Sequence, residues 1–367
     1  MASYPHTAIP TWTWLIPALA AILLALKLAG IAPQEWVSVQ IAAGLLLAGS
    51  VFAAVHHAEI LALKVGEPFG SIILAVAVTV IEVGLIIAVF ISGVAGSETV
   101  GRDTVFSATM IVLNGIVGLC LVLGASRHHE QSFQLQGASA ALNVLGPLAI
   151  LTMVLPNFTA AVLGPFYSHL QLIYVAVCSL ALYMMFVFVQ TVRHRDYFLD
   201  RADPSGATDP HAIVPSGRTV FVSAIFLPIA LASVVFMAKL LSHPLEDAIA
   251  AAGLPRTMVG VVIAAIVLMP EGVASVRAAM ANRLQNSLNL ALGSAIASIG
   301  LTIPTVAIAS LVTGLALPLG LSEGNMVLLL LTLFVSGQTL STGRTTVLQG
   351  GVHLVIFAVF LLIAAAP

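Results

Sequence analysis

Long runs of apolar residues follow one another along nearly the whole chain. A helix needs about 20 mostly apolar residues to cross the hydrocarbon core of a bilayer. Strands of a membrane barrel would alternate in polarity over about ten residues instead. The pattern therefore predicts an all-α polytopic membrane protein with about eleven transmembrane helices. Their expected ranges are 12–30, 36–56, 68–94, 104–124, 137–156, 169–191, 219–241, 258–280, 287–314, 320–341 and 345–366.

The composition supports this interpretation. Hydrophobic residues make up 60% of the chain and charged residues only 8%, whereas soluble domains contain about 25% charged residues. The two cysteines, Cys120 and Cys178, lie inside apolar runs. We expect them to be inert core residues and not a disulfide.

Residues 192–218 form the longest polar stretch and are rich in Asp, Pro, Gly and Arg. This composition predicts a linker loop that divides the chain. Six expected helices precede the linker and five follow it, so residues 1–35 supply an extra N-terminal helix. Residues 36–191 and 219–367 then form two five-helix repeats. Because five is odd, the repeats enter the membrane in opposite directions, as in inverted-repeat transporters.

Basic residues indicate the orientation, because cytoplasmic loops hold an excess of Lys and Arg. If the N-terminus is cytoplasmic, most Lys and Arg residues lie in cytoplasmic loops. Eleven helices then place the C-terminus on the outer side. The inner loops then hold Lys64, Arg127, Arg193, Arg195, Arg201, Arg218, Arg277, Arg283 and Arg344, and the outer loops hold Lys27, Arg102, Lys239 and Arg256.

Two glutamates, Glu82 and Glu271, stand in the middle of apolar runs, each in the second helix of its repeat. An ionised carboxylate at membrane depth costs roughly 2.5–3.5 kcal/mol, so such a residue predicts a functional site. The inverted repeats would relate the two by a pseudo-two-fold axis in the membrane plane. Polar residues at helical spacing share their faces: Ser71 and Thr79 with Glu82, and Ser275 and Asn282 with Glu271.

Pro270 precedes Glu271 and Gly272 follows it. Proline removes a backbone donor and frees a carbonyl. We therefore predict a helix break that offers oxygen ligands beside the carboxylate. The fourth and ninth helices add Asn114, Ser294 and Ser298 as supporting polar ligands. For any one of these side chains, a hydrogen bond between helices is the alternative.

Carboxylates, hydroxyls, amides and carbonyls form a hard-oxygen set that suits Ca²⁺, Mg²⁺ or Na⁺. Two carboxylates balance one divalent ion or two protons. The site therefore predicts a secondary antiporter that trades a cation for protons at Glu82 and Glu271 by alternating access, with no cofactor. A cation channel would need a continuous pore, which two inequivalent sites disfavour. An intramembrane hydrolase would need an Asp pair or a metal motif, and the expected helices contain no Asp.

His56, His57, Glu59 and Glu67 occupy one short segment at the inner end of the second helix. Histidines at a membrane boundary often lie along the interface, and the alternative is sensing of cytoplasmic pH. The two glutamates of this segment could attract cations to the entrance of the site.

Several short segments occur in a distinctive order. The first repeat carries Val65-Gly66-Glu67, Gly70-Ser71 and then Glu82. The second carries Glu271, Met280-Ala281-Asn282-Arg283, Ala291-Leu292-Gly293-Ser294 and Ile303-Pro304, and residues 342–350 read TGRTTVLQG. In these segments the chain resembles calcium/proton exchangers of the calcium/cation antiporter superfamily, most closely the bacterial ChaA type.

The resemblance covers nearly the whole chain. It implies eleven helices, a first helix outside the repeats, a bacterial inner membrane, and proton-driven efflux of a cation, either Ca²⁺ alone or Ca²⁺ together with Na⁺ or K⁺. The expected partners are inorganic cations, protons and the lipid bilayer, and no nucleic acid. The wider family has an Asn three residues before each glutamate, where this chain has Thr79 and Leu268. Asn114 aligns with a family Ser and restores one amide. Exchange of Na⁺ or K⁺ for protons is therefore the alternative to Ca²⁺.

Overall fold

The computed structural model describes residues 9–33, 35–66, 69–90, 99–199, 215–314 and 316–367. Within these ranges, eleven helices are long and apolar enough to cross a membrane, which confirms the predicted all-α class and number of spans. The chain divides into two compact units, Met1–Val94 with Pro204–Ala252 (unit 1) and Ala95–Asp203 with Gly253–Pro367 (unit 2). Each unit takes helices from both predicted repeats.

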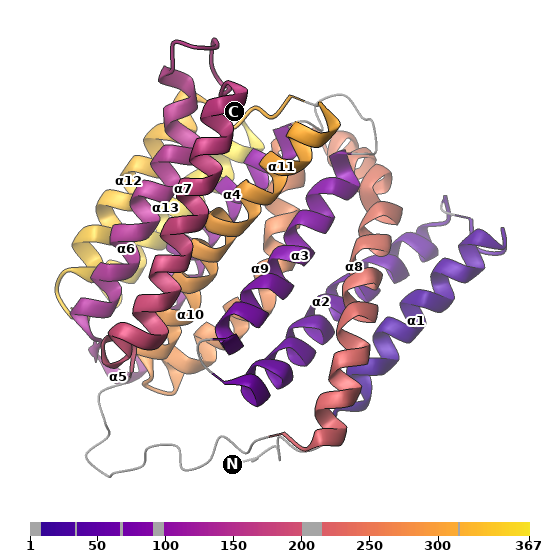
Figure 1. Ribbon diagram of the computed structural model, residues 1–367, viewed down its shortest axis with the longest axis horizontal. Coiled ribbons are helices and arrows are strands. Elements are labelled where there is room, and N and C mark those ends of the chain that lie inside the picture. The colour runs from indigo at the N-terminus through magenta and orange to yellow at the C-terminus, as the bar shows by residue number, and fades with distance from the viewer. Residues whose placement is uncertain (1–8, 34, 67–68, 91–98, 200–214, 315) are drawn as a thin grey trace. The chain divides into compact units, whose positions relative to one another are not determined.

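Unit 1 contains four of the described helices: α1 (Thr11–Leu28), α2 (Val37–Val65), α3 (Phe69–Phe90) and α8 (Gly217–Ala251). Helix α8 packs along α2 and also contacts α3 and α1, and Figure 1 shows α2, α3 and α8 side by side. A Cβ atom added at Gly84 would lie only 2.5 Å from Cγ2 of Val235. The absence of a side chain at Gly84 therefore lets α3 approach α8 closely.

Two helices of unit 1 are longer than the sequence pattern predicted. Helix α2 continues nine residues beyond residue 56 and ends at Val65. It passes through His57, whose side chain is fully buried, so the polar pair at residues 56 and 57 does not mark a helix end. Helix α8 includes Pro228 and Pro244 and has 35 residues, although each proline removes one backbone donor.

Unit 2 contains the other seven spans. A π-helical segment interrupts the fourth and ninth spans of the chain, and π-helical or 3₁₀ segments end the fifth and sixth. The fourth span consists of α4 (Val100–Met110), η2 (Ile111–Ile116) and α5 (Val117–His128); the fifth of α6 (Leu135–Ala149), η3 (Ile150–Val154) and η4 (Leu155–Phe158); the sixth of α7 (His169–Phe188) and η5 (Val189–Arg193); the eighth of α9 (Thr257–Met280); the ninth of α10 (Leu284–Ala297), η7 (Ser298–Thr302) and α11 (Ile303–Thr313); the tenth of α12 (Glu323–Leu340); and the eleventh of α13 (Val347–Ala365).

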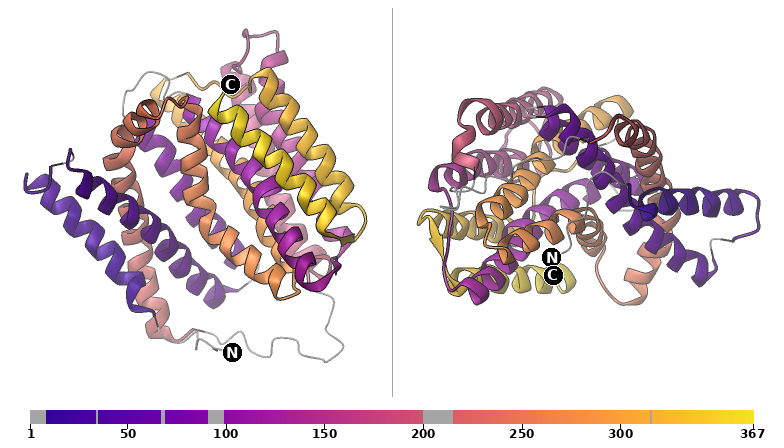
Figure 2. Two further views of the ribbon diagram at one scale, coloured as in Figure 1. Left: turned by 180° about the vertical axis from the view of Figure 1, so that it is seen from behind. Right: turned by 90° about the horizontal axis from the view of Figure 1, so that it is seen from below.

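Glycines bring α13 close to the fourth span. A Cβ atom at Gly350 would lie 2.7 Å from the backbone nitrogen of Val122, and one at Gly118 would lie 3.1 Å from Cβ of His353. Figure 2 shows α12 and α13 as neighbouring helices at the yellow end of the colour scale. The segment η2 contacts α9, α10, α12 and α13, so it lies at the centre of unit 2.

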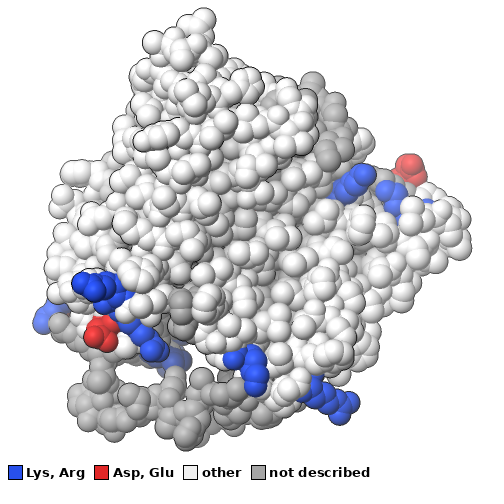
Figure 3. All heavy atoms as spheres, viewed as in Figure 1, with Lys and Arg blue, Asp and Glu red and all other residues white. Residues whose placement is uncertain are grey.

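Short connections close the ends of the helices in unit 2. The strand β1 (Gln131–Ser132) pairs antiparallel with β2 (Arg344–Thr345), and the 3₁₀ turn η6 (Arg195–Phe198) follows η5. On the face drawn in Figure 3, the basic and acidic side chains form a few small groups, and most of the described surface is uncharged. Uncharged surface of this kind suits contact with the hydrocarbon core of a bilayer. Residues 200–214 of the predicted linker lie outside the described residues.

Candidate cation site

Glu82 lies in the middle of α3 in unit 1, and only 2% of its surface is exposed. Helix α3 contacts both α2 and α8, and Gly84, two residues on, packs against Val235 of α8. A carboxylate so deeply buried in an apolar helix is costly to keep ionised. Its position therefore supports binding of a proton or a cation over a solvated surface role.

The two predicted companions of Glu82 differ in burial. Thr79 is buried, and its hydroxyl donates to the carbonyl oxygen of Ala75 at 2.8 Å. That bond occupies the hydroxyl hydrogen and leaves the oxygen lone pairs available to a cation. Ser71 is half-buried, two turns nearer the start of α3.

The buried side chain of His57 connects α2 with two other helices of unit 1. Its Nδ1 lies 3.1 Å from Oγ of Ser223 on α8, and its Nε2 lies 3.2 Å from the carbonyl oxygen of Thr13 on α1. The ring also stacks on Phe226 at 5.9 Å. The expectation of an interfacial His57 is therefore wrong, because three helices enclose this side chain.

The other residues of the predicted entrance are less enclosed. His56 is half-buried, and its ring lies 5.8 Å from that of Trp12. Glu59 is exposed on α2, and Glu67 lies outside the described residues. Sensing of pH and attraction of cations by this segment remain predictions.

Glu271 lies on α9 in unit 2 and is 6% exposed. Ser275, one turn later, is fully buried, and its hydroxyl has no hydrogen-bond partner among the described residues. A buried hydroxyl without a partner is costly. Its position one turn from a carboxylate makes it suitable as a cation ligand.

The predicted helix break beside Glu271 is not present. Helix α9 runs without interruption through Pro270 and Gly272 to Met280. A proline in a helix still removes one donor, but here the helix continues on both sides of the ring. Gly272 serves instead for close packing, because a Cβ atom there would lie 3.2 Å from Cδ1 of Ile116.

The predicted polar stripe of α9 ends before Asn282. This residue lies beyond the end of the helix at a φ of 59°, and its Oδ1 accepts from Nε2 of Gln131 at 3.0 Å. Asn282 therefore belongs to the connection near β1 and does not share the face of Glu271.

The prediction that no membrane helix contains Asp is also wrong. Asp103 lies inside α4 near the start of the fourth span, where its Oδ1 pairs with Nε of Arg102 at 2.8 Å.

The predicted supporting ligands in the fourth and ninth spans occupy equivalent interruptions. Asn114 lies in the π-helical segment η2, and Ser298 lies in the π-helical segment η7. Each segment is in the third span of its predicted repeat. Such π-helical turns are rare and frequently occur at functional sites. Ser294, one turn before Ser298, is half-buried, and its Oγ has no hydrogen-bond partner among the described residues.

Asn114 belongs to a buried polar network that sequence reasoning missed. Its Nδ2 donates to Oγ1 of Thr332 at 2.9 Å, and its Oδ1 lies 3.1 Å from Nδ1 of His353. The other ring nitrogen of His353 lies 3.1 Å from Oγ1 of Thr339. Histidine inside a predicted span is itself a signal of function, so the rule that selected the glutamates could also have selected His353.

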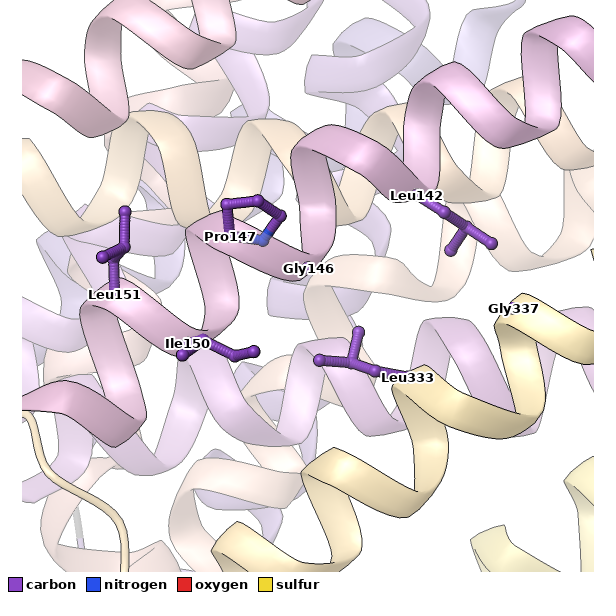
Figure 4. A pocket seen from close by; sticks show the side chains of 7 residues that line it. All are labelled: Leu142, Gly146, Pro147, Ile150, Leu151, Leu333 and Gly337. Atoms are coloured by element: carbon purple, nitrogen blue, oxygen red, sulfur yellow. The ribbon is translucent and has the colours of Figure 1, made fainter.

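Unit 2 also contains an apolar cavity of about 400 Å³ between the fifth and tenth spans. Figure 4 shows its lining side chains, which project from α6, η3 and α12. All its lining side chains are apolar, so none of them offers an oxygen ligand to a cation. The lining residues are Leu142, Gly146, Pro147, Ile150, Leu151, Leu333 and Gly337.

The predicted site residues are divided between the two units. Unit 1 holds Ser71, Thr79 and Glu82 along α3. Unit 2 holds Asn114, Glu271, Ser275, Ser294 and Ser298 on spans whose segments contact one another. The described residues include no group of three or more His, Cys, Asp or Glu side chains that could hold a metal ion.

Comparisons with known proteins agree with the transporter interpretation. The model of the sodium/calcium exchanger protein family matches residues 36–192 and 222–366. The putative ionic transporter y4hA of Sinorhizobium fredii is 54% identical over 98% of this chain and 97% of its own length. The sodium-potassium/proton antiporter ChaA of Escherichia coli is 35% identical over 95% of this chain and 94% of its own length.

Solved structures share the fold at low sequence identity. The structure of native YfkE superposes with a TM-score of 0.73 at 16% identity and covers 97% of this chain and 100% of its own. The H⁺/Ca²⁺ exchanger CAX superposes with a TM-score of 0.68 at 14% identity and covers 96% and 89%. These matches show the architecture of the chain.

Proposed function

Because the chain belongs to the sodium/calcium exchanger family, and is therefore a secondary transporter and not an enzyme, we propose that it is an antiporter that exchanges protons for small cytoplasmic cations. Glu82 and Glu271 bind either the cation or protons, and the protein alternates access between the two sides of the membrane. Thr79, Ser275, Asn114, Ser294 and Ser298 supply further oxygen ligands.

One observation carries this proposal. Glu82 and Glu271 are 2% and 6% exposed, although each lies in an apolar membrane span. A carboxylate in such surroundings is tolerated when a proton or a cation neutralises it. Proton and cation compete for the same oxygens, and this competition couples their movements.

Na⁺ and K⁺ are the cargo that we favour. Ca²⁺ takes six to eight oxygen ligands, and this chain has Thr79 and Leu268 where the wider family has amide side chains. Leu268 is 1% exposed on α9, one turn before Glu271, so it places a hydrocarbon where an oxygen ligand would otherwise lie. The name of the 35% identical relative, a sodium-potassium/proton antiporter, points the same way.

Ca²⁺ is the second candidate. Two carboxylates match the charge of one divalent ion, and both are buried here. If both glutamates bind the same ion, two protons replace one Ca²⁺ without a change in the charge of the site. This alternative shares the residues of the main proposal and differs from it in the number of protons exchanged.

Everted membrane vesicles containing the protein test the proposal. Respiration acidifies their interior, and a fluorescent pH dye reports the gradient. Addition of Na⁺ or K⁺ should release protons from vesicles with the wild-type chain and not from vesicles with Glu82→Gln or Glu271→Gln. A response to Ca²⁺ alone would support the second candidate. A gradient that none of the three ions dissipates would overturn antiport of these cations.

A further inference from the structure

We propose that His353 is a positioning residue that sets the orientation of the Asn114 amide for cation binding. The inference rests on the proposed function and extends it to α13, a helix that sequence reasoning did not connect with the site. His353 and Asn114 are 1% and 0% exposed. They are separated by 239 residues in the chain, and their side chains lie 3.1 Å apart.

The hydrogen bonds determine the state of each group. Nδ2 of Asn114 donates to Oγ1 of Thr332, so Oδ1 is the atom that faces Nδ1 of His353. An amide oxygen only accepts, so Nδ1 of His353 must carry a hydrogen. In the neutral ring Nε2 is then an acceptor, and the hydroxyl of Thr339 can donate to it. Thr332, Asn114, His353 and Thr339 can therefore all be hydrogen-bonded to one another, in that order, while His353 is uncharged.

This arrangement links the orientation of the Asn114 amide to the tautomer of His353. An Asn amide can rotate by half a turn and exchange its oxygen for its nitrogen. A half-turn here would face His353 with NH₂ and Thr332 with an oxygen, so it would require His353 to move its hydrogen from Nδ1 to Nε2 and Thr332 to donate. While Nδ1 carries the hydrogen, the carbonyl oxygen of Asn114 faces His353 and keeps a second lone pair for a cation.

The network is also connected with the helix of Glu271. Asn114 lies in η2, and Ile116 in the same π-helical segment packs against Gly272 of α9. Gly118, one turn after Asn114, packs against Cβ of His353. His353 and Gly272 therefore both pack against the part of the fourth span that carries Asn114.

Three variants separate positioning from other roles. His353→Ala removes the donor to Asn114, and Thr332→Val removes the acceptor while keeping the shape of the side chain. Each should raise the KM for the transported cation by about three- to tenfold, the effect of one lost hydrogen bond, with a smaller change in kcat. His353→Gln carries a donor and an acceptor but cannot be protonated at neutral pH, so it should retain most of the wild-type affinity. Ser336→Ala is the matched control, because Ser336 is buried on α12 and its Oγ has no hydrogen-bond partner among the described residues.

The measurement is cation-dependent proton release from proteoliposomes at fixed pH, with Na⁺, K⁺ and Ca²⁺ tested separately. The proposal is overturned if Thr332→Val keeps the wild-type KM, or if His353→Gln loses exchange as completely as His353→Ala does, because the ring would then act through its own protonation. Thr332→Val keeps the test decisive if His353→Ala does not fold. Failure of the proposed function would appear differently, as a wild-type protein that exchanges none of the three cations.

Discussion

Gly272, on the helix of Glu271, lies against Ile116 of the π-helical segment that carries Asn114. A Cβ atom at Gly272 would lie 3.2 Å from Cδ1 and 3.4 Å from Cγ1 of Ile116. The shorter of these distances is tighter than most real Cβ contacts, so the Ile116 side chain would have to shift to admit even a small side chain at residue 272. A large side chain there would press on η2 directly after Glu271.

Gly272→Leu should impair exchange through this contact. Overpacking of a tight interface costs about 1–3 kcal/mol, and here the displacement would move the residue next to Glu271. Ile116→Ala in the same chain should restore part of the activity by making room. Gly337→Leu is the control, because a Cβ atom there meets no heavy atom within 4 Å. Initial rates in proteoliposomes measure the effect, and equal rates for the single and double variants would contradict it.

Glu82→Gln and Glu271→Gln should each abolish exchange and leave the protein folded. Glutamine keeps the size and the hydrogen-bonding groups of glutamate but cannot trade a proton for a cation. Glu323→Gln, at the exposed start of α12, should exchange at the wild-type rate. Reconstituted proteins with matched elution profiles give the comparison, and near wild-type exchange by either buried variant would exclude that glutamate from the mechanism.

Tyr167→Phe should lower stability without changing exchange. The hydroxyl of Tyr167 donates to the carbonyl oxygen of Leu151 at 2.5 Å, and a lost hydrogen bond costs about 0.5–1.5 kcal/mol. Burial raises the pKa of Tyr167 to about 12. A raised pKa means that its contribution to stability is complete below about pH 10 and is lost as the pH rises through 12.

Thermal unfolding of the detergent-solubilised protein checks this expectation. The Tm of Tyr167→Phe should be below that of the wild type at pH 7. The difference should narrow between pH 10 and pH 12, since only the wild type loses stability by ionising this group. A constant difference across that range would show that the hydroxyl does not titrate with folding.

The spans and the two glutamates were predictable because their signals are local. A run of about twenty apolar residues predicts a membrane helix whatever its packing partners are. Glu82 and Glu271 are ionisable residues within such runs, so the sequence alone identifies them. The partners of polar groups are not local. Asn114 bonds to residues 218 and 239 positions away, and His57 bonds to a serine 166 positions away, so their roles follow from tertiary packing.

Helix ends and interruptions are hard to predict for a related reason. The polar pair at residues 56 and 57 suggests a helix end, yet burial of His57 between α1 and α8 lets α2 continue to Val65. Pro270 predicts a break in α9, yet the helix continues through it. The π-helical segments η2 and η7 have no composition that would distinguish them from ordinary helix, because they depend on how their neighbours pack.

The dependence of cation affinity on pH should identify the transported ion. A cation and a proton cannot occupy the same carboxylate oxygens, so the apparent affinity must fall as the pH is lowered. A divalent ion that displaces two protons should lose up to about two decades of affinity per pH unit once both glutamates are protonated, and a monovalent ion that displaces one proton should lose about one decade.

Titrations of purified protein with Na⁺, K⁺ and Ca²⁺ from pH 5.5 to 8.5 give the slope of log affinity against pH for each ion. Glu82→Gln and Glu271→Gln are the controls, and each should flatten these slopes. A slope near one for Na⁺ or K⁺ would support the favoured cargo, a slope near two for Ca²⁺ would support the second candidate, and an affinity independent of pH would exclude competition at these glutamates as the coupling mechanism.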